Sequence, residues 1–312
     1  MSEQEPGLIL HHYALSPFSE KARLILAQKR LPWTSIEQPM VLPRPELERL
    51  VGGYRRIPVL QQGRHFYCDT SLIAARLEAI KASPSFLAPS PTLSRLAESY
   101  AGTALFACAN ALVFQPGGVR TMLKILGREQ LAALQKDRAE LMRESRGVQF
   151  QPRAAAASLQ AWLRSLDQEL AAGAFLSGKE PGLADFSVLA PLWYIRQFYS
   201  AALQLDGFAN VRDWMDRLKA LSESNAPRSA PPDHCLAVVM AAPEDRPVDS
   251  SAQDPAVGTR IGVQPADYGR SPSVGVLREL DDNEIVIERT DRELGALYVH
   301  FPRVGYEWEA VS

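Results

Sequence analysis

The sequence has no long apolar run and no large excess of either charge. Nowhere in its 312 residues does an apolar stretch approach the roughly 18–20 residues of a membrane span, and residues 1–6 (MSEQEP) lack the basic and apolar parts of a signal peptide. We therefore expect a cytoplasmic protein that does not contact a membrane. The 34 Lys and Arg against 36 Asp and Glu give a net charge of −2, which does not provide the basic surface typical of nucleic-acid binding.

Cysteine is scarce, and metal-binding spacings are missing. Cys68, Cys108 and Cys235 lie far apart without a C-x-x-C pair, so they provide neither a disulfide framework nor a metal knuckle, and they fit a reducing compartment. The five histidines show no metal-ligand spacing, and the sequence has no Walker-type loop and no G-x-G-x-x-G motif. We therefore expect no metal site.

The first eighty residues contain an ordered change of hydrophobic periodicity. With 46% hydrophobic and 22% charged residues the chain has a globular composition, and its length predicts roughly two or three domains. Strand-like and helical segments follow in the order βαβ, an irregular stretch around a short helix, and ββα: strands at 8–13, 33–37, 57–61 and 65–68, and helices at 18–30 and 72–80. The intervening helix favours a parallel first pair of strands, and the short turn favours an antiparallel last pair.

The middle of the chain changes composition twice. A Pro- and Ser-rich segment, 83–91, separates a first unit, 1–82, from a helical unit, 92–224. In that unit we expect helices near 93–114, 118–145, 152–172, 184–200 and 208–223. Residues 225–256 form a linker rich in Pro, Ala, Ser and Asp, in which 235–242 is apolar enough for a short helix that docks on the core.

The last segment, 257–312, returns to strand-like patterns. We expect strands near 259–263, 273–280, 284–289 and 297–301, and around 306–309. This small β module is too short to be stable alone. Its aromatic side chains would form a large exposed apolar patch if it hung free. We therefore expect it to fold onto the helical unit, either as a structural part or as a wall of the substrate cleft.

Four short motifs in the first unit resemble the glutathione transferase superfamily, and its omega class in particular. They are S-P-F-S-E-K-A-R-L at 16–24, R-P-E at 44–46, I-P-V-L at 57–60 and D-T at 69–70, in the order and spacing of that family. The resemblance covers roughly residues 7–224. It implies an α/β thioredoxin-like domain followed by an all-α helical domain, with the β module as a C-terminal extension.

The resemblance implies a glutathione-binding role for several of these residues. Pro58 corresponds to the cis-proline of the fold, which turns the backbone of Ile57 towards the cysteinyl unit of glutathione. Asp69 and Thr70 stand where a helix begins, and the free N–H groups and positive dipole there attract a carboxylate. In the family this pair holds the γ-glutamyl end. Each of the two residues is also explained as a helix cap.

Three further residues complete the implied glutathione site: Phe18, Arg44 and Arg56. Arg44 would supply a cation for a glutathione carboxylate, although a solvated surface position explains it equally well. Arg56 also belongs, with Arg49 and Arg55, to a small basic cluster that we expect to form a solvated face.

Ser16 occupies the position at which family members contact the glutathione sulfur. Ser followed by Pro at the start of a helix is explained fully by capping. A hydroxyl that donates to sulfur at a helix N-terminus would also favour thiolate over thiol. Both interpretations stay open, and Ser19 and Tyr13 are nearby hydroxyls that could replace Ser16. The omega-class cysteine is missing, so glutathione cannot form a mixed disulfide at this position.

The implied activity is that of a detoxifying glutathione transferase, with glutathione as co-substrate and a small hydrophobic electrophile as the second substrate. The alternatives are a non-catalytic protein-interaction module and a glutathione-dependent reductase without a protein cysteine. Family members commonly form homodimers, and we expect one here. In the helical unit, Gly182-Leu183-Ala184-Asp185 stands where the family has S/T-x-x-D, and we expect Asp185 to bind backbone N–H groups as a folding signature.

Overall fold

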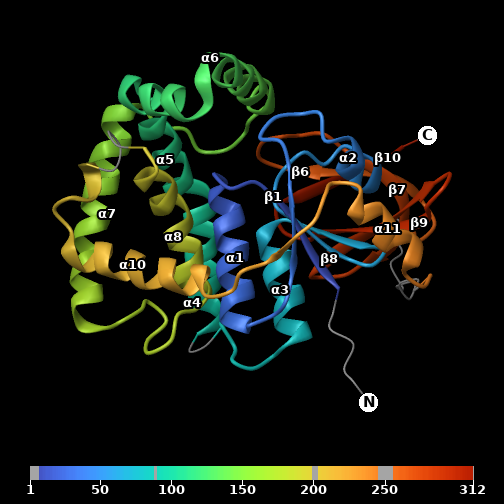
Figure 1. The fold of residues 1–312 in the computed structure, drawn as a ribbon, viewed down its shortest axis with the longest axis horizontal. Helices are drawn as coiled ribbons and strands as arrows, with labels where there is room; N and C mark the ends of the chain where they lie inside the picture. Colours follow the sequence, from blue (N-terminus) through green and yellow to red (C-terminus); the bar gives the residue numbers. More distant parts are fainter. Residues whose placement is uncertain (1–6, 88–89, 199–202, 245–255, 312) are drawn as a thin grey trace.

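Figure 1 shows helices on one side of the molecule and, on the other, one long sheet in which N-terminal and C-terminal strands lie side by side. The computed structural model describes residues 7–87, 90–198, 203–244 and 256–311. The candidate site lies where the helical side meets the sheet.

The first unit has the predicted order of elements. They are β1 (Leu8–His12), α1 (Pro17–Lys29), β2 (Thr34–Glu37), α2 (Pro45–Val51), β3 (Val59–Gln62), β4 (His65–Cys68) and α3 (Thr70–Ile80). β1 pairs in parallel with β2 and antiparallel with β3, and β3 pairs antiparallel with β4. The predicted parallel and antiparallel pairs are therefore confirmed.

The second unit is helical, as predicted. Its elements are α4 (Pro91–Tyr100), the π-helical turn η1 (Ala101–Leu105), α5 (Phe106–Val113), α6 (Pro116–Leu141), α7 (Pro152–Ala172), α8 (Leu183–Arg196), the short 3-10 turn η2 (Leu203–Leu205) and α10 (Ala209–Glu223). The predicted end of the helix at 184–200 falls on residues outside the described ranges. No helix within those ranges has the length and apolarity that a membrane crossing requires.

Asp185 holds the start of α8, as the sequence predicts. Its carboxylate is fully buried and accepts hydrogen bonds from the N–H groups of Ser177 and Gly182 at 3.0 and 3.1 Å. It also accepts from the Leu176 N–H and from the Trp214 indole of α10, both at 2.8 Å. The folding signature is confirmed, and the same carboxylate ties α8 to α10.

Helix α1 places Ser16 at the junction of the two units. Ser16 is extended, and its side chain accepts a hydrogen bond from the Ser19 N–H, while Pro17 fills a first-turn position that needs no N–H donor. At the other end Arg30 takes the left-handed conformation, with φ 49°. The buried face of α1 packs against α3 and against α8 and α10 of the helical unit.

The C-terminal module forms five strands close to the predicted ones: β6 (Arg260–Pro265), β7 (Ser273–Leu280), β8 (Glu284–Asp291), β9 (Gly295–Pro302) and β10 (Tyr306–Ala310). The module is docked, as predicted, but its main docking surface is the first unit and not the helical unit. β9 pairs in parallel with β4 of the first unit, so the strand order is β10-β6-β7-β8-β9-β4-β3-β1-β2-β5, where β5 is Arg228–Ser229. The module therefore extends the first unit's sheet.

The reason for this pairing lies in the two strands that meet. β4 (HFYC) and the last six residues of β9 (LYVHFP) are mostly apolar and almost wholly buried. Such strands are typical of the interior of a sheet. Without β9, β4 would present an unpaired apolar edge.

Separate cores lie on the two faces of the sheet. On one face, α1 and α3 pack with the helical unit around Leu24, Leu77 and Phe186. On the other, α2 and α11 (His234–Ala241) pack with module strands in a second cluster that includes Leu50 and Cys235. The predicted short helix and its docking are confirmed; residues 245–255 of the predicted linker lie outside the described part of the chain.

Candidate functional site

Two hollows meet beside the N-termini of α1 and α3. The first, the apolar cavity, has a volume of about 390 Å³ and is lined by Ser16 and by residues of α5, α6 and α8. The second, the polar groove, measures about 520 Å³ and is lined by Asp69 and by residues of α4 and the C-terminal module. Phe18, Ile57 and Arg56 line both hollows, so the two adjoin at these residues.

The residues predicted from the sequence converge on these hollows. Each of the eight lines one hollow or both: Ser16, Phe18, Arg44, Arg56, Ile57, Pro58, Asp69 and Thr70. These residues converge because the segments before α1, before β3 and before α3 all lie at the same end of the neighbouring strands β1, β3 and β4.

Ser16 faces the apolar cavity while it caps α1. Its Oγ accepts from the Ser19 N–H at 3.2 Å, which leaves the hydroxyl proton available for another acceptor. Ser19, by contrast, is fully buried and lines neither hollow, and its hydroxyl has no partner among the described residues. Ser19 is therefore badly placed to replace Ser16.

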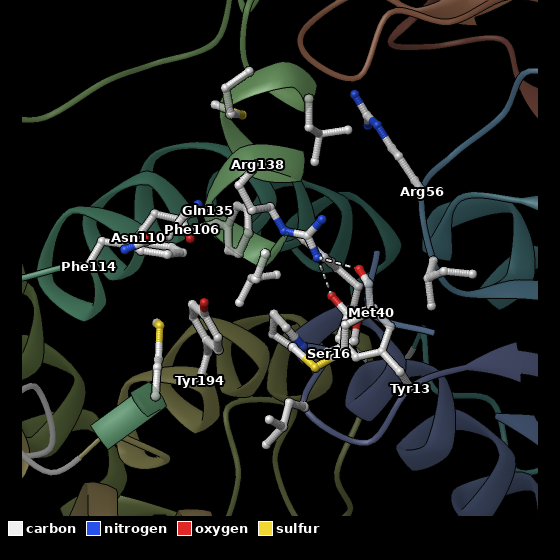
Figure 2. Close-up of a pocket in the computed structure, with 18 of the residues that line it drawn as sticks. Tyr13, Ser16, Met40, Arg56, Phe106, Asn110, Phe114, Gln135, Arg138 and Tyr194 are labelled. Carbon is white, nitrogen blue, oxygen red and sulfur yellow. Dashed lines mark hydrogen bonds between the residues drawn. The ribbon is translucent and has the colours of Figure 1, made fainter. Parts of the chain in front are cut away.

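Tyr13 and Arg138 lie beside Ser16 in the cavity (Figure 2). The Nη2 amino group of Arg138, from α6, donates to the Tyr13 hydroxyl oxygen and to the Met40 carbonyl, both at 3.2 Å. The Tyr13 hydroxyl thus lies next to a cation, which strengthens it as a hydrogen-bond donor. Sequence reasoning missed Arg138, since nothing in the pattern of α6 singles out this arginine from its exposed neighbours.

Ile57 lies where the two hollows join. The Ile57–Pro58 peptide bond is cis, as predicted. None of the hydrogen bonds described for the chain uses the backbone N–H or C=O of Ile57. An extended peptide that bridged the hollows could therefore pair with this backbone.

Asp69 has an uncommon backbone conformation at the start of α3. Its φ is +73°, a value that non-glycine residues rarely adopt and that costs roughly 1–3 kcal/mol. Hydrogen bonds from the Ser71 N–H and hydroxyl, at 3.0 and 2.9 Å, hold its carboxylate, and the Tyr306 hydroxyl lies 3.3 Å from it. These contacts thus hold Asp69 in an unfavourable backbone conformation, with its carboxylate in the lining of the polar groove.

Thr70 is reached by a buried lysine that sequence reasoning also missed. The ammonium of Lys21 donates to the Thr70 hydroxyl oxygen at 3.1 Å and to the Glu98 carboxylate of α4 at 2.6 Å. Burial opposes ionisation of Glu98, but the charges and hydrogen bonds of Lys21 and Arg95 together hold its pKa below the usual value. A signal was available: Lys21 precedes Leu24 and Ile25 by three and four residues, which puts it on the buried face of α1.

Arg44 lines the cavity but also holds the loop before α2. Its guanidinium donates to the backbone carbonyls of Pro39, Met40 and Arg55 at 2.8, 3.2 and 2.8 Å. Only 4% of Arg44 is exposed, and burial lowers its pKa to about 10, so the group stays charged at neutral pH. The solvated position considered from sequence does not occur.

The C-terminal module contributes a wall of the site through its β6–β7 loop. Arg56 forms hydrogen bonds with the Asp267 carboxylate and the Tyr268 carbonyl, and its guanidinium lies 3.9 Å from the centre of the Tyr268 ring. Tyr268 lines both hollows. The same loop reaches α6, where the Gly269 N–H donates to the Leu141 carbonyl at 2.9 Å.

The basic cluster expected to form a solvated face is instead distributed among separate ion pairs. Arg49 pairs with Asp291 of β8 at 2.6 Å, and Arg55 pairs with Asp137 of α6 at 2.8 Å. With Arg56 held by the module, each arginine joins the first unit to another segment. The expectation is wrong because these carboxylates lie far along the chain. No group of three or more His, Cys, Asp or Glu among the described residues could hold a metal ion.

Comparison with known proteins gives similarity over most of the chain. The model of the glutathione S-transferase N-terminal domain matches residues 10–85, and that of the C-terminal domain matches residues 131–217. A GST-like protein from Pseudomonas syringae is 30% identical, with a TM-score of 0.76, over 98% of this chain and 100% of that one. The similarity to that protein therefore includes the C-terminal module.

Other solved structures share the fold of the first two units. FzlA from C. crescentus is 23% identical, with a TM-score of 0.50, over 69% of this chain and 88% of its own. A glutathione S-transferase from Rhodospirillum rubrum F11 is 20% identical, with a TM-score of 0.51, over 68% of this chain and 88% of its own. Comparison with curated protein sequences gives no match.

Proposed function

The chain belongs to the glutathione transferase superfamily, and from that premise we propose that it is an enzyme that conjugates glutathione to an apolar electrophile. The observation that carries the proposal is the meeting of the two hollows at Ile57. A tripeptide whose γ-glutamyl end lies at Asp69 in the polar groove, and whose middle pairs with Ile57, places its thiol beside Ser16 in the apolar cavity.

The charges in the groove suit the γ-glutamyl end. Its ammonium would face Asp69, and its carboxylate would face Thr70 and the free N–H groups at the start of α3. The Thr70 hydroxyl oxygen already accepts from Lys21, so its proton is free to donate to that carboxylate. Arg44 and Arg56 would face the glycine carboxylate.

The chemistry at Ser16 is thiol activation. The Ser16 hydroxyl donates to the sulfur, which favours the thiolate together with the N-terminal dipole of α1. The S–H bond breaks and its proton passes to water. The sulfur electron pair then forms a bond to the electrophilic carbon, and the displaced pair departs with the leaving group. Phe106, Phe114 and Phe198 provide an apolar surface for the electrophile.

Replacement of Ser16 by Ala tests this role. We expect kcat for conjugation to fall about ten- to a hundredfold, because one hydrogen bond to a charged group contributes roughly 1.5–3 kcal/mol. Glutathione affinity should change little, since the tripeptide is held mainly at Ile57, Asp69 and Thr70. Conjugation kinetics and the ultraviolet absorbance of the bound thiolate measure both effects.

Ser19→Ala is the matched control, because this hydroxyl lies on the same turn and lines neither hollow. Full activity and an unchanged thiolate signal in Ser16→Ala would show that Ser16 is only a helix cap, with Tyr13 as the next candidate for thiol activation.

Retention on glutathione resin separates the proposed enzyme from a non-catalytic module. A comparison of conjugation with disulfide reduction separates it from a cysteine-free reductase.

We also propose that the protein is a homodimer in which α4 faces a second copy of the chain. Leu93, Leu96 and Tyr100 follow one another at helical spacing and are 64%, 61% and 44% exposed. Identical apolar faces can pair about a twofold axis.

Leu96→Arg is expected to convert the dimer to a monomer at micromolar concentration, measured by light scattering. Met240→Arg, at a residue 62% exposed on α11, is the control that should remain dimeric; a monomeric native protein would contradict the proposal.

A further inference from the structure

The apolar cavity carries charge of one sign. Four arginines line it, Arg44, Arg55, Arg56 and Arg138, and none of the described lining residues is acidic. The remaining lining is mostly aromatic and aliphatic and includes the amides of Asn110 and Gln135 (Figure 2). A wholly apolar ligand would add no negative charge to balance these arginines inside the cavity.

The protein only partly neutralises these arginines. Arg55 and Arg138 share the carboxylate of Asp137, and Arg56 pairs with Asp267. The Arg44 guanidinium donates to backbone carbonyls alone, among the hydrogen bonds described.

Neither of the two carboxylates lines the cavity, although Asp267 lines the adjoining polar groove. A third, Glu140, stands 3.7 Å from Arg55, but its side chain is 55% exposed and screened by solvent. The cavity is therefore electropositive and attracts an anion.

Arg138 is the arginine placed to meet a second substrate. It comes from α6 of the helical unit, and it extends towards the end of the cavity that holds Tyr13 and Ser16 (Figure 2). Three of the N–H donors on its terminal nitrogens contact Asp137, Tyr13 and Met40. The Nε–H and one terminal N–H have no partner among the described residues, and 25% of the side chain is exposed.

We propose that the second substrate is an apolar electrophile with an anionic group, a carboxylate or sulfonate, and that Arg138 binds this group. The inference rests on the proposed function, which assigns Arg44 and Arg56 to glutathione. The apolar body of the substrate lies against Phe106 and Phe114, and its charged end lies against the free donors of Arg138. Arg138 is thus a determinant of specificity in the helical unit.

Two fluorescent probes that differ by one sulfonate test the assignment without turnover. They are 8-anilinonaphthalene-1-sulfonate and its uncharged counterpart N-phenyl-1-naphthylamine, titrated into the full chain, into Arg138→Gln and into Arg128→Gln. Arg128 is an exposed arginine on the same helix and serves as the matched control. A charge-assisted hydrogen bond changes an affinity by roughly ten- to a hundredfold.

We expect the native protein to bind the sulfonate at least about tenfold more tightly than the uncharged probe. Arg138→Gln should abolish that preference and leave the affinity for the uncharged probe unchanged, which also shows that the cavity is intact. Equal affinities in the native protein, a preference that survives Arg138→Gln, or an equal loss of both probes would each overturn the proposal. Failure of glutathione to bind while the sulfonate preference persists would count against the proposed function alone.

Discussion

A chain that ends at Ala256, and so lacks the C-terminal module, is expected to lose most of its stability and to be recovered largely as insoluble protein. The core cluster on the module's face of the sheet contains 22 buried residues, of which ten belong to the module. Burial of one large apolar side chain contributes about 1.5–3 kcal/mol. The loss therefore reaches on the order of 10 kcal/mol, comparable with the whole stability of a domain.

Polar contacts between the C-terminal module and the first unit also contribute to the stability of the fold. The buried Ser273 hydroxyl donates to the Val51 carbonyl at 2.6 Å and accepts from the Tyr54 N–H at 3.1 Å. Arg289 donates to the carbonyls of Arg49 and Leu50, both at 2.8 Å. Truncation would leave these groups around α2 without their partners and would uncover the edge of β4.

Thermal unfolding followed by circular dichroism measures the effect, with a chain that ends at Ala310 as control because it keeps β10. Any soluble truncated protein should unfold at least about 10 °C below the native chain. An unchanged unfolding temperature, with native helical signal, would show that the module is an appendage and not part of the core.

Replacement of Lys21 by Met is expected to lower the free energy of unfolding by about 3 kcal/mol, because removal of one partner from a buried ion pair leaves the other charge uncompensated. Lys21 is 3% exposed, and the side chain of its partner Glu98 is 12% exposed. Arg95 remains beside Glu98 at 2.8 Å, which keeps the effect at the lower end of the range. Urea unfolding measures it.

Arg95→Met is the matched control, since Arg95 pairs with the same carboxylate but its own side chain is 43% exposed. We expect that substitution to cost less than about 1 kcal/mol. Equal effects of the two substitutions would contradict the view that burial makes the Lys21–Glu98 pair important. Lys21→Met should also weaken glutathione binding, because Thr70 loses its donor.

The Lys21–Glu98 ion pair also predicts that the free energy of unfolding depends on pH. The pKa of Glu98 is held below its ordinary value of 4.5 in the folded protein, because Lys21 and Arg95 together outweigh the effect of burial. The ion pair therefore contributes its full stability above pH 4.5, and that contribution is lost as the pH falls through the lower folded-state pKa. The difference in unfolding free energy between the native protein and Glu98→Gln should shrink steadily below pH 4.5.

Local features of the fold were predictable because short-range physics determines them. The Ser-Pro start of α1, the turn between β3 and β4, and the hydrogen bonds of Asp185 with the N–H groups of Ser177 and Gly182 each follow from a few neighbouring residues. The order of the first strands and helices followed from their periodicity. The strands of the module were predictable for the same reason.

Long-range partners were not predictable from these patterns. The pairing of β4 with β9 joins segments more than 200 residues apart, and only the buried pattern of both strands hinted at it. Arg138 and Tyr268 reach the site from α6 and from the module, and their side-chain types are as common on a surface as in a site. The motifs identified the residues that we propose for glutathione binding, and the structure added most of the wall of the apolar cavity.

The central claim is that glutathione spans the polar groove and the apolar cavity, with its sulfur at Ser16. A crystal structure of the protein soaked with glutathione tests it most directly. The account predicts a γ-glutamyl group at Asp69 and Thr70, a cysteinyl backbone paired with Ile57, and a sulfur within hydrogen-bond distance of the Ser16 hydroxyl. Hollows that stay empty at millimolar glutathione, or a sulfur bound away from Ser16, would contradict it.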